Sequence, residues 1–404
     1  MKKLIAGALV LAALLCGCGK QAPAPTTAPT TEPTTAPTTE PTTVPTTEPA
    51  PVYRNPLNGE ILEAPYDKRI YAVTINNLQE AMPHIGIQEA DLFMEMYVNG
   101  SIIRGLAVYT DPSDVPQIGS VRSTRFMFTQ LAQCYDLVVA HAGGSSAVLN
   151  NVREVGIDNF SIDVGDDAPY AFRDRDRFRS GKTWDACLFA KGQGLEARAA
   201  EKGIELTSDP EKDYGLIFEE NGIPEEGEAA DAIYLTLTYK GSRATSRKET
   251  HMIYHPDLGR YVYNQYGKEM VDGVTGEPES FQNVIIMLGE INMNQYGYQV
   301  ASFEKGGTGY YANGGRIIPI TWTCEGGNTP FKFFKADGSP LVMGEGNTYI
   351  AITQNESPVS YEKLDPPPET TAETVGETVS EAPAETSPDT PQDGVPQSAD
   401  EDYL

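Results

Sequence analysis

Residues that could bind an anion gather in one stretch of the chain, residues 118–146 (IGSVRSTRFMFTQLAQCYDLVVAHAGGSS). Two arginines lie in the polar break that opens it, and a glycine pair followed by serine ends it. Guanidinium groups suit phosphate or carboxylate, and free N–H groups at a helix start favour the same ligands. The candidate ligands are Arg122, Arg125, Gly143, Gly144 and Ser145. The competing interpretation is a plain βαβ crossover whose arginines are solvated.

The spacing of apolar residues predicts the elements that position these ligands. We expect a buried strand over residues 69–76, a helix over 123–134, a short strand over 136–141 and a second helix over 147–155. The glycine pair then lies where a strand passes into a helix, at the carboxyl edge of a sheet. The two arginines approach that edge from the preceding loop, and His141 supports the site from the end of the strand.

Residues 91–109 form the clearest hairpin signal, because Asn99 and Gly100 are the preferred type I′ pair between two apolar runs. A two-residue turn there predicts that Glu95 faces Arg104 across the ladder. One interpretation is a structural cross-strand ion pair. The other is that Glu95 orients Arg104 toward the two arginines described above, which makes Arg104 a further ligand.

Four more arginines recur at a spacing of two within residues 168–189, with aspartates between them. If this segment is extended, all four guanidinium groups share one face. Arg173 and Arg175 would then form a second wall for a phosphate or carboxylate. The alternative is a solvated strand edge whose alternating charges block aggregation. The four residues are Arg173, Arg175, Arg177 and Arg179.

The amino terminus predicts a membrane-anchored lipoprotein. Two lysines precede an apolar run that ends in Leu-Cys-Gly-Cys, which is typical of a bacterial lipobox. Cys18 has a small residue immediately before it, so we expect Cys18 to carry the lipid, diacylglycerol and palmitate, of the mature protein. A diacylated cysteine holds a chain at the extracytoplasmic face of the cell membrane without a spanning helix.

The formal net charge of −27 makes nucleic acid an improbable partner, because the phosphate backbone is repelled by an acidic protein. Any anionic ligand must therefore be held by a local cluster of arginines. Three cysteines remain beyond the lipobox, Cys134, Cys187 and Cys324, too few and too scattered for a zinc site. We expect all three to be buried, and a disulfide between two of them is the alternative. The HMIYH stretch at 251–255 favours a strand, so no metal site is predicted.

Composition and periodicity predict an α+β or α/β protein. An N-terminal α/β domain with a mixed sheet precedes a β-rich, mainly antiparallel C-terminal domain. Proline at every fourth position predicts an extended tether before the first domain, and regularly spaced acids predict a disordered tail after the second. The predicted segments are 1–18 (signal peptide), 19–52 (tether), 53–202 (N-terminal domain), 203–230 (acidic connector), 231–356 (C-terminal domain) and 357–404 (tail).

Several ordered motifs resemble those of the YerB-like lipoproteins, a two-domain family described by domain-of-unknown-function names. The resemblance covers about residues 53–356 and implies an extracytoplasmic lipoprotein with no assigned reaction, associated with cell-wall synthesis. The chain departs from it at residues 180–183, where relatives carry a Pro-His-Asn-like sequence. The layout of residues 91–156 is also similar to that of LytR-CpsA-Psr phosphotransferases. The motifs that carry the family resemblance are RNPLNGE, GSIIRGLAVY, IGSVRSTR, DLVVAHAGGS and GTGYYANGGRIIPITW.

Two functions fit these observations. The first is a noncatalytic binding or regulatory module of the cell envelope that engages an anionic ligand, a cell-wall glycan, a polyprenyl phosphate or a cell-wall synthesis protein, with no cofactor. The alternative is a phosphotransferase or hydrolase acting on a polyprenyl-phosphate-linked precursor. In it the arginines grip a diphosphate, and Asp91 or Glu95 holds Mg²⁺ or acts as base. No nucleophile and base pair stands out, which favours the first hypothesis.

Overall fold

The computed structural model describes residues 51–240, 245–326 and 329–365 of the 404-residue chain. The predicted signal peptide, Cys18, nearly all of the tether and most of the acidic tail lie outside the described residues. Within the described part, no helix combines the length and the apolar character that a membrane crossing requires.

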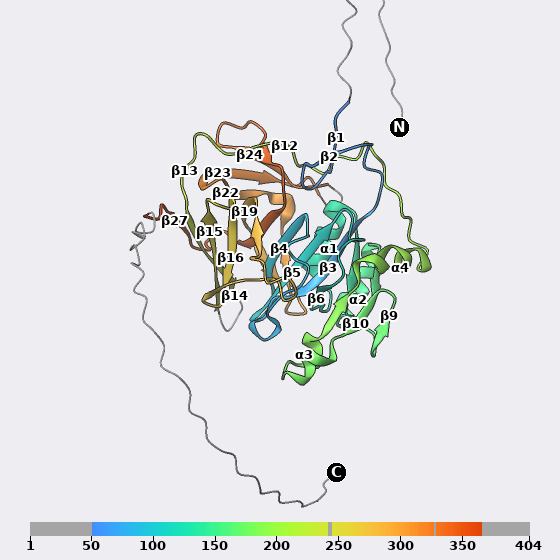
Figure 1. Ribbon diagram of the computed structural model, residues 1–404. Helices are drawn as coiled ribbons and strands as arrows, with labels where there is room; N and C mark the ends of the chain where they lie inside the picture. The colour runs from blue at the N-terminus through green and yellow to red at the C-terminus, as the bar shows by residue number, and fades with distance from the viewer. Residues whose placement is uncertain (1–50, 241–244, 327–328, 366–404) are drawn as a thin grey trace, which may run out of the picture. The chain divides into compact units, whose positions relative to one another are not determined.

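A large mixed sheet runs through the described part of the chain (Figure 1). It joins strands from both halves of the sequence, because β26 pairs in parallel with both β19 and β4. One further strand, β24 (Lys332–Lys335), pairs with β23. In spatial order the remaining strands are β13 (Glu228–Ala229), β23 (Arg316–Thr323), β22 (Gly307–Asn313), β19 (Asn283–Gly289), β26 (Thr348–Gln354), β4 (Leu92–Asn99), β5 (Ile102–Tyr109), β3 (Ile70–Asn76), β7 (Leu137–His141) and β8 (Asn159–Ser161).

The N-terminal part of this sheet has the predicted mixed character. β3 pairs antiparallel with β5 and parallel with β7, which in turn is parallel to β8. β3 and β7 are buried along their whole length, which is why both are continuous apolar runs. Helices α1 (Phe126–Tyr135) and α2 (Ser146–Val155) follow β6 (Ile118–Gly119) and β7, close to their predicted positions. The predicted fold class is confirmed.

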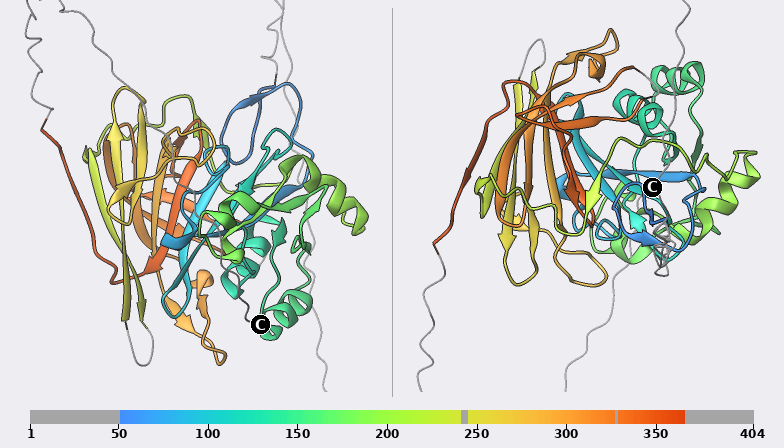
Figure 2. Two further views of the ribbon diagram at one scale, coloured as in Figure 1. Left: turned by 60° about the horizontal axis from the view of Figure 1, so that its bottom comes forward. Right: turned by 90° about the horizontal axis from the view of Figure 1, so that it is seen from above.

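A second, antiparallel sheet packs beside the large one, as both views of Figure 2 show. It is built from the strand-rich segment that follows the acidic connector, apart from one strand near the end of the described chain. Its strands are β17 (Lys268–Glu269), β16 (Arg260–Gln265), β15 (Thr245–His255), β14 (Ala232–Lys240), β27 (Val359–Glu362) and β18 (Ser280–Phe281). His251 and His255 lie on β15, as the sequence predicts.

Short elements complete the described chain. A small four-stranded sheet carries the segment after α2, and three two-stranded pairs support loops. These strands are β6, β11 (Leu188–Ala190), β10 (Ala171–Arg173) and β9 (Asp167–Ala168), then β1 (Tyr53–Arg54) with β2 (Ile61–Leu62), β12 (Phe218–Glu219) with β25 (Met343–Gly344), and β20 (Ile291–Met293) with β21 (Gln299–Ala301). The remaining helices are α3 (Arg175–Arg179), α4 (Leu195–Glu201) and the 3-10 turns η1 (Gln79–Ala81), η2 (Trp184–Ala186), η3 (Gly192–Gly194) and η4 (Phe303–Lys305).

The predicted register of the β4–β5 hairpin is wrong by one residue. The ladder pairs Met96 with Arg104 and Glu95 with Gly105, because an irregularity between Tyr97 and Asn99 leaves an extra residue in β4. A shift of one residue moves every side chain to the other face of a strand. Glu95 and Arg104 therefore project from opposite faces, and Glu95 cannot orient Arg104.

Glu95 instead lies between the two sheets, fully buried. Its carboxylate accepts hydrogen bonds from β15, β16, β26 and the residue after β3. Because a buried charge is costly unless it is paired and hydrogen-bonded, this saturation explains how the carboxylate is tolerated. Its five donors are the ammonium of Lys248, Asn77 Nδ2 at 2.6 Å, Tyr263 OH at 3.0 Å, Thr250 Oγ1 at 3.0 Å and the hydroxyl of Tyr349.

Asp91 has a similar structural role at the other end of β4. It accepts hydrogen bonds from Asn58 Nδ2 at 2.6 Å and from Thr110 N and Oγ1 at 2.6 and 2.9 Å. These contacts fasten the RNPLNGE loop to β4 and to the residue that follows β5. Burial raises the pKa of Asp91 to about 6, against the opposing effect of the hydrogen bonds from Thr110.

Replacing Glu95 by glutamine should destabilise the protein strongly. The change keeps the side-chain volume but leaves the ammonium of Lys248 buried without a counter-charge, so we expect the free energy of unfolding to fall by about 3–5 kcal/mol. Denaturant titration measures this fall. The control is Glu356→Gln, which breaks an exposed pair with Lys240 and should cost less than about 1 kcal/mol. Equal small losses in both variants would contradict the structural role of Glu95.

The pKa of Asp91 predicts a pH-dependent contribution to stability. Because this pKa is raised above that of an unfolded aspartate, the folded state binds the proton more tightly, and stability falls as pH rises through about 6. Relative to Asp91→Asn, the wild-type free energy of unfolding should decrease by about 1 kcal/mol between pH 5 and pH 7. If the difference in free energy of unfolding between the two proteins stays constant from pH 5 to pH 7, the raised pKa of Asp91 is contradicted.

Candidate functional site

Three arginines gather at the carboxyl ends of the parallel strands β3 and β7. Arg104 is the third residue of β5 and pairs with the last residue of β3, and Arg122 and Arg125 lie in the segment between β6 and α1. Burial lowers the pKa of Arg104, and the charges of Arg122 and Arg125 lower it further. The three guanidinium groups are therefore close enough to repel one another. We call Arg104, Arg122 and Arg125 the arginine cluster.

Backbone hydrogen bonds hold the loop of the arginine cluster against both strands. Arg122 N donates to Thr74 O at 2.9 Å, and Ala142 N donates to Arg122 O at 3.0 Å. Thr124 N donates to Gly143 O at 2.9 Å, so the glycine pair lies directly beside this loop. The sequence-predicted elements thus bring these segments together at one edge of the sheet.

Arg104 is buried without a carboxylate partner. It is 1% exposed, and Nη1 donates to Asn76 Oδ1 at 3.1 Å and to Ile103 O at 2.9 Å. Among the described residues, neither Arg104 nor Arg125 forms a salt bridge, whereas Arg122 contacts Asp185 at 2.7 Å. A buried guanidinium of this kind is costly, so a nearby anion would stabilise it.

Polar atoms around Arg104 also lack hydrogen-bond partners. Asn76 donates its backbone N–H to Ser120 O at 2.8 Å, which places Ser120 beside the residue that Arg104 contacts. Buried polar atoms are nearly always satisfied in proteins, so atoms without a partner stand out. Within the described part of the chain, the unpartnered atoms here are Asn76 Nδ2, Arg104 Nε, Ser120 Oγ, Arg122 Nε and Thr124 Oγ1.

The start of α1 adds a further favourable field for an anion. Arg125 is its N-cap residue, and no side chain caps the first free N–H groups. The predicted helix start, near residue 123, is three residues early because residues 123–125 stay outside the helix and Arg125 is extended. A helix N-terminus carries partial positive charge, so it acts in the same direction as the guanidinium groups.

The glycine pair and Ser145 are engaged by the protein itself. Ser145 caps α2, with Val148 N donating to its Oγ at 3.4 Å, and Tyr298 OH donates to the same oxygen at 2.9 Å. Gly143 has a φ of +66°, which favours glycine, while Gly144 packs near Leu149. The N-terminus of α2 is thus less open than that of α1.

His141 is buried and links two loops. Its Nδ1 lies 3.0 Å from Gly143 O and its Nε2 lies 3.1 Å from Asn159 Oδ1. Burial lowers the pKa of His141, which favours the neutral ring. His141 therefore positions the glycine pair beside the arginine cluster.

The predicted extended arrangement of four arginines is wrong. Arg173 ends β10, but Arg175–Arg179 form the short helix α3, with Asp174 as N-cap accepting from Arg177 N. Arg173 pairs with Asp163 at 2.5 Å and packs over Trp184, and Arg175 pairs with Asp166. Both guanidinium groups are thus neutralised by acids of their own, and they do not form a common wall.

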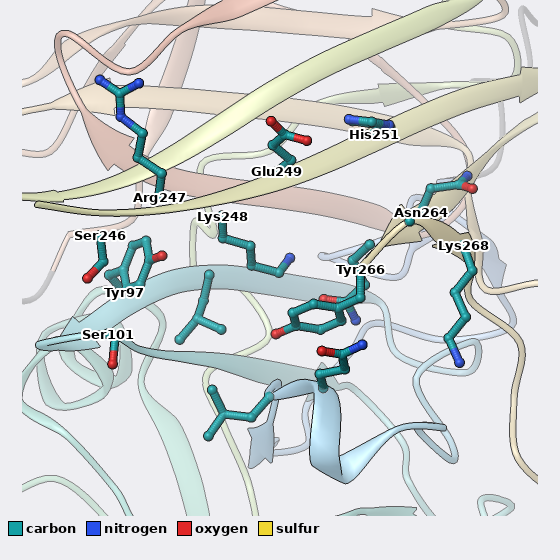
Figure 3. Close-up of a pocket in the computed structure, with 15 residues that line it drawn as sticks. Tyr97, Ser101, Ser246, Arg247, Lys248, Glu249, His251, Asn264, Tyr266 and Lys268 are labelled. Carbon is teal, nitrogen blue, oxygen red and sulfur yellow. The ribbon is translucent and has the colours of Figure 1, made fainter.

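A cavity of about 990 Å³ lies between β4–β5 and the second sheet. Figure 3 shows Lys248 and Tyr266 directed into it, whereas Arg247 and Glu249 project from the other face of β15. The Lys248 ammonium lies 5.5 Å from the Tyr266 ring, and burial lowers the Lys248 pKa against the opposing effect of Glu95. Tyr266 has a left-handed φ of +55°, which is unusual for a residue with a side chain.

Gln265 lines this cavity and carries an acceptor without a partner in the described part of the chain. Its side chain is 2% exposed and donates through Nε2 to Asn77 Oδ1 at 3.0 Å, while its Oε1 has no partner among the described residues. Neither Gln265 nor Lys248 was predicted from the sequence. The alternation of β15 places Lys248, Thr250 and Met252 on one buried face, and that alternation was the available signal.

Comparison with known proteins identifies the family. The model described as "Protein of unknown function (DUF3048) N-terminal domain" matches residues 57–205, and that of the corresponding C-terminal domain matches residues 237–350. The protein named "Putative lipoprotein YerB" of Bacillus subtilis is 26% identical over 313 residues, which are 74% of this chain and 85% of that protein.

A solved structure agrees with the fold. The crystal structure of the YerB protein from Bacillus subtilis matches with a TM-score of 0.62 and 22% identity, covering 76% of this chain and 99% of the other. None of these names states an activity, so the enzymatic alternative has no support from the relatives. The two family matches span more than half of the sequence, and the chain belongs to the DUF3048 family of YerB-like proteins.

Proposed function

We propose that this protein is a noncatalytic binding lipoprotein of the bacterial envelope that holds an anionic group, phosphate or carboxylate, at the arginine cluster. The lipobox-like stretch supports lipid attachment at Cys18 and a position at the extracytoplasmic face of the cell membrane, and the name of the Bacillus relative supports a lipoprotein. The observation that carries the proposal is Arg104, a buried guanidinium with no carboxylate partner among the described residues.

The surroundings of Arg104 suit an anion better than they suit a structural role. A structural buried charge is normally paired. Glu95, which lies in the same hairpin as Arg104, is paired in this way with Lys248 of β15. Arg104 instead faces two more arginines and several unpartnered polar atoms. A tetrahedral or planar oxyanion offers several acceptor positions, which suits a segment that carries several N–H and O–H donors.

Binding of three probes tests this proposal. Inorganic phosphate, pyrophosphate and farnesyl phosphate are titrated into the protein by calorimetry, and Arg104→Met is expected to weaken binding at least tenfold. The same change should leave the free energy of unfolding unchanged or raise it, because it removes an unpaired buried charge. The control Arg175→Ala removes an exposed arginine that pairs with Asp166 and should leave affinity unchanged.

The outcomes separate the possible ligands. Equal affinity for phosphate and farnesyl phosphate would identify the phosphate group alone as the ligand, and tighter binding of farnesyl phosphate would indicate a lipid-linked precursor. Wild-type affinity in Arg104→Met, together with a loss of stability, would show that Arg104 is structural and would remove the proposal.

A second binding function is favoured by the cavity beside Lys248. It combines hydroxyl groups, the ring of Tyr266 and the unsatisfied Oε1 of Gln265, while all three Lys248 protons are already used by Glu95, Thr250 and Tyr263. We therefore propose a neutral ligand with hydrogen-bond donors and an apolar face, as a saccharide has.

Chitotriose is a suitable probe for the cavity. Gln265→Met keeps the side-chain length but removes the acceptor, so its affinity for chitotriose should fall about tenfold, in line with the loss of one buried hydrogen bond. Gln299→Met is the control, because Gln299 is also buried with an unpartnered Oε1 but lies on β21, outside the cavity lining. No binding by the wild-type protein would refute the saccharide proposal.

A further inference from the structure

Two cysteines from distant parts of the chain meet in the core. Cys134 lies in the last turn of α1, and Cys324 directly follows β23, 190 residues later. Their Sγ atoms are 3.8 Å apart, and neither is in a disulfide. Each residue is 4% exposed. The third described cysteine, Cys187, lies elsewhere and donates to Thr183 O at 3.2 Å.

A cavity of about 70 Å³ gives access to both thiols. It is lined by Cys134 and Cys324 together with Gln130, Gln133 and Phe303, among others. Because a water molecule takes about 30 Å³ of liquid volume, the cavity holds about two waters. A molecule as small as hydrogen peroxide fits this space, whereas a tripeptide disulfide is larger than the cavity.

The surroundings of the two sulfurs differ, which gives each a separate chemical role. Cys324 Sγ lies 3.4 Å from Thr329 O, 3.5 Å from Gly326 O and 3.8 Å from Thr329 Oγ1, and the hydrogen bond from Cys134 is the chief cause that lowers the pKa of Cys324 to about 6. The same hydrogen bond and burial raise the pKa of Cys134. The thiolate is the nucleophile in cysteine chemistry, so Cys324 attacks first and Cys134 resolves.

We propose that Cys134 and Cys324 form a peroxide-sensitive pair that closes to a disulfide between α1 and β23. The Cys324 thiolate attacks one oxygen of hydrogen peroxide, the O–O bond breaks, and hydroxide leaves, giving the sulfenic acid of Cys324. Cys134 then attacks the Cys324 sulfur, the S–O bond breaks, and the released hydroxide takes the Cys134 proton. Two thiols and one peroxide thus give one disulfide and two waters.

The bond would cross-link the two halves of the fold. It closes a long loop, and a disulfide that closes a long loop restricts the unfolded chain most. The sulfurs must approach from 3.8 Å to about 2 Å for the bond to form. The reversible consequence is a stiffer connection between β23 and the helix whose other end carries Arg125.

Mass spectrometry of the intact protein tests the proposal. Hydrogen peroxide should lower the mass by about 2 Da, because two hydrogens are lost, and tryptic mapping should join the peptides that contain Cys134 and Cys324. Oxidised glutathione at the same concentration should react at least tenfold more slowly with the folded protein. Thermal melting of the oxidised form should shift upward by several degrees and return on addition of dithiothreitol.

Single-cysteine variants assign the two roles. In Cys134→Ser, dimedone should trap a sulfenic acid on Cys324, because no resolving thiol remains, and in Cys324→Ser it should label Cys134 much less. Cys187→Ser is the control and should keep the mass change. An unchanged mass in peroxide-treated wild-type protein would overturn the proposal without reliance on any variant. Equal rates with peroxide and glutathione would overturn the size selection by the cavity.

Discussion

The carboxylate of Glu95 is the contact on which the arrangement of the two sheets depends. It is completely buried, and its donors come from β15, β16, β26 and the end of β3. These elements belong to both sheets and to both halves of the sequence. A charge in this position is tolerable only while every donor is in place, so it favours one packing of the two sheets over any other.

The same hairpin carries a second buried charge, Arg104, which within the described part of the chain is not paired with a charged partner in the way that Glu95 is. Glu95 and Arg104 project from opposite faces of adjacent strands, and the carboxylate is saturated while the guanidinium forms no salt bridge among the described residues. Burial of an unsatisfied charge costs stability, and sites that keep such a cost are usually functional. The contrast between these two side chains is the physical basis for placing an anion at the arginine cluster.

Local sequence signals predicted much of the fold and part of the candidate site. Apolar periodicity and the Asn99-Gly100 turn located β3, the β4–β5 hairpin, α1, β7 and α2, because these elements bury one face or both. The proximity of Arg122 to the glycine pair could be predicted, because loops that follow parallel strands gather at the carboxyl edge of the sheet. Contacts between Glu95 and Lys248 could not be predicted, since the partners are 153 residues apart and the pairing depends on how the sheets pack.

Two of the predictions made from the sequence are wrong for local structural reasons. The one-residue irregularity in β4 reversed the faces of Glu95 and Arg104, and bulges leave little trace in a short apolar run. The alternating arginines formed a helix instead of a strand, with Asp174 supplying its cap. Aspartate before a charged run is an N-cap signal that could have indicated this helix.

The occupancy of the arginine cluster is the most direct test of the account. Crystals soaked in selenate, a tetrahedral oxyanion with an anomalous scatterer, would show a selenium peak beside Arg104 and Arg122, with selenate oxygens within hydrogen-bonding distance of Arg104 Nε and Arg122 Nε, if the cluster binds anions. An anomalous map with no peak there, and ordered water satisfying Arg104 Nε, Ser120 Oγ and Thr124 Oγ1 instead, would contradict it.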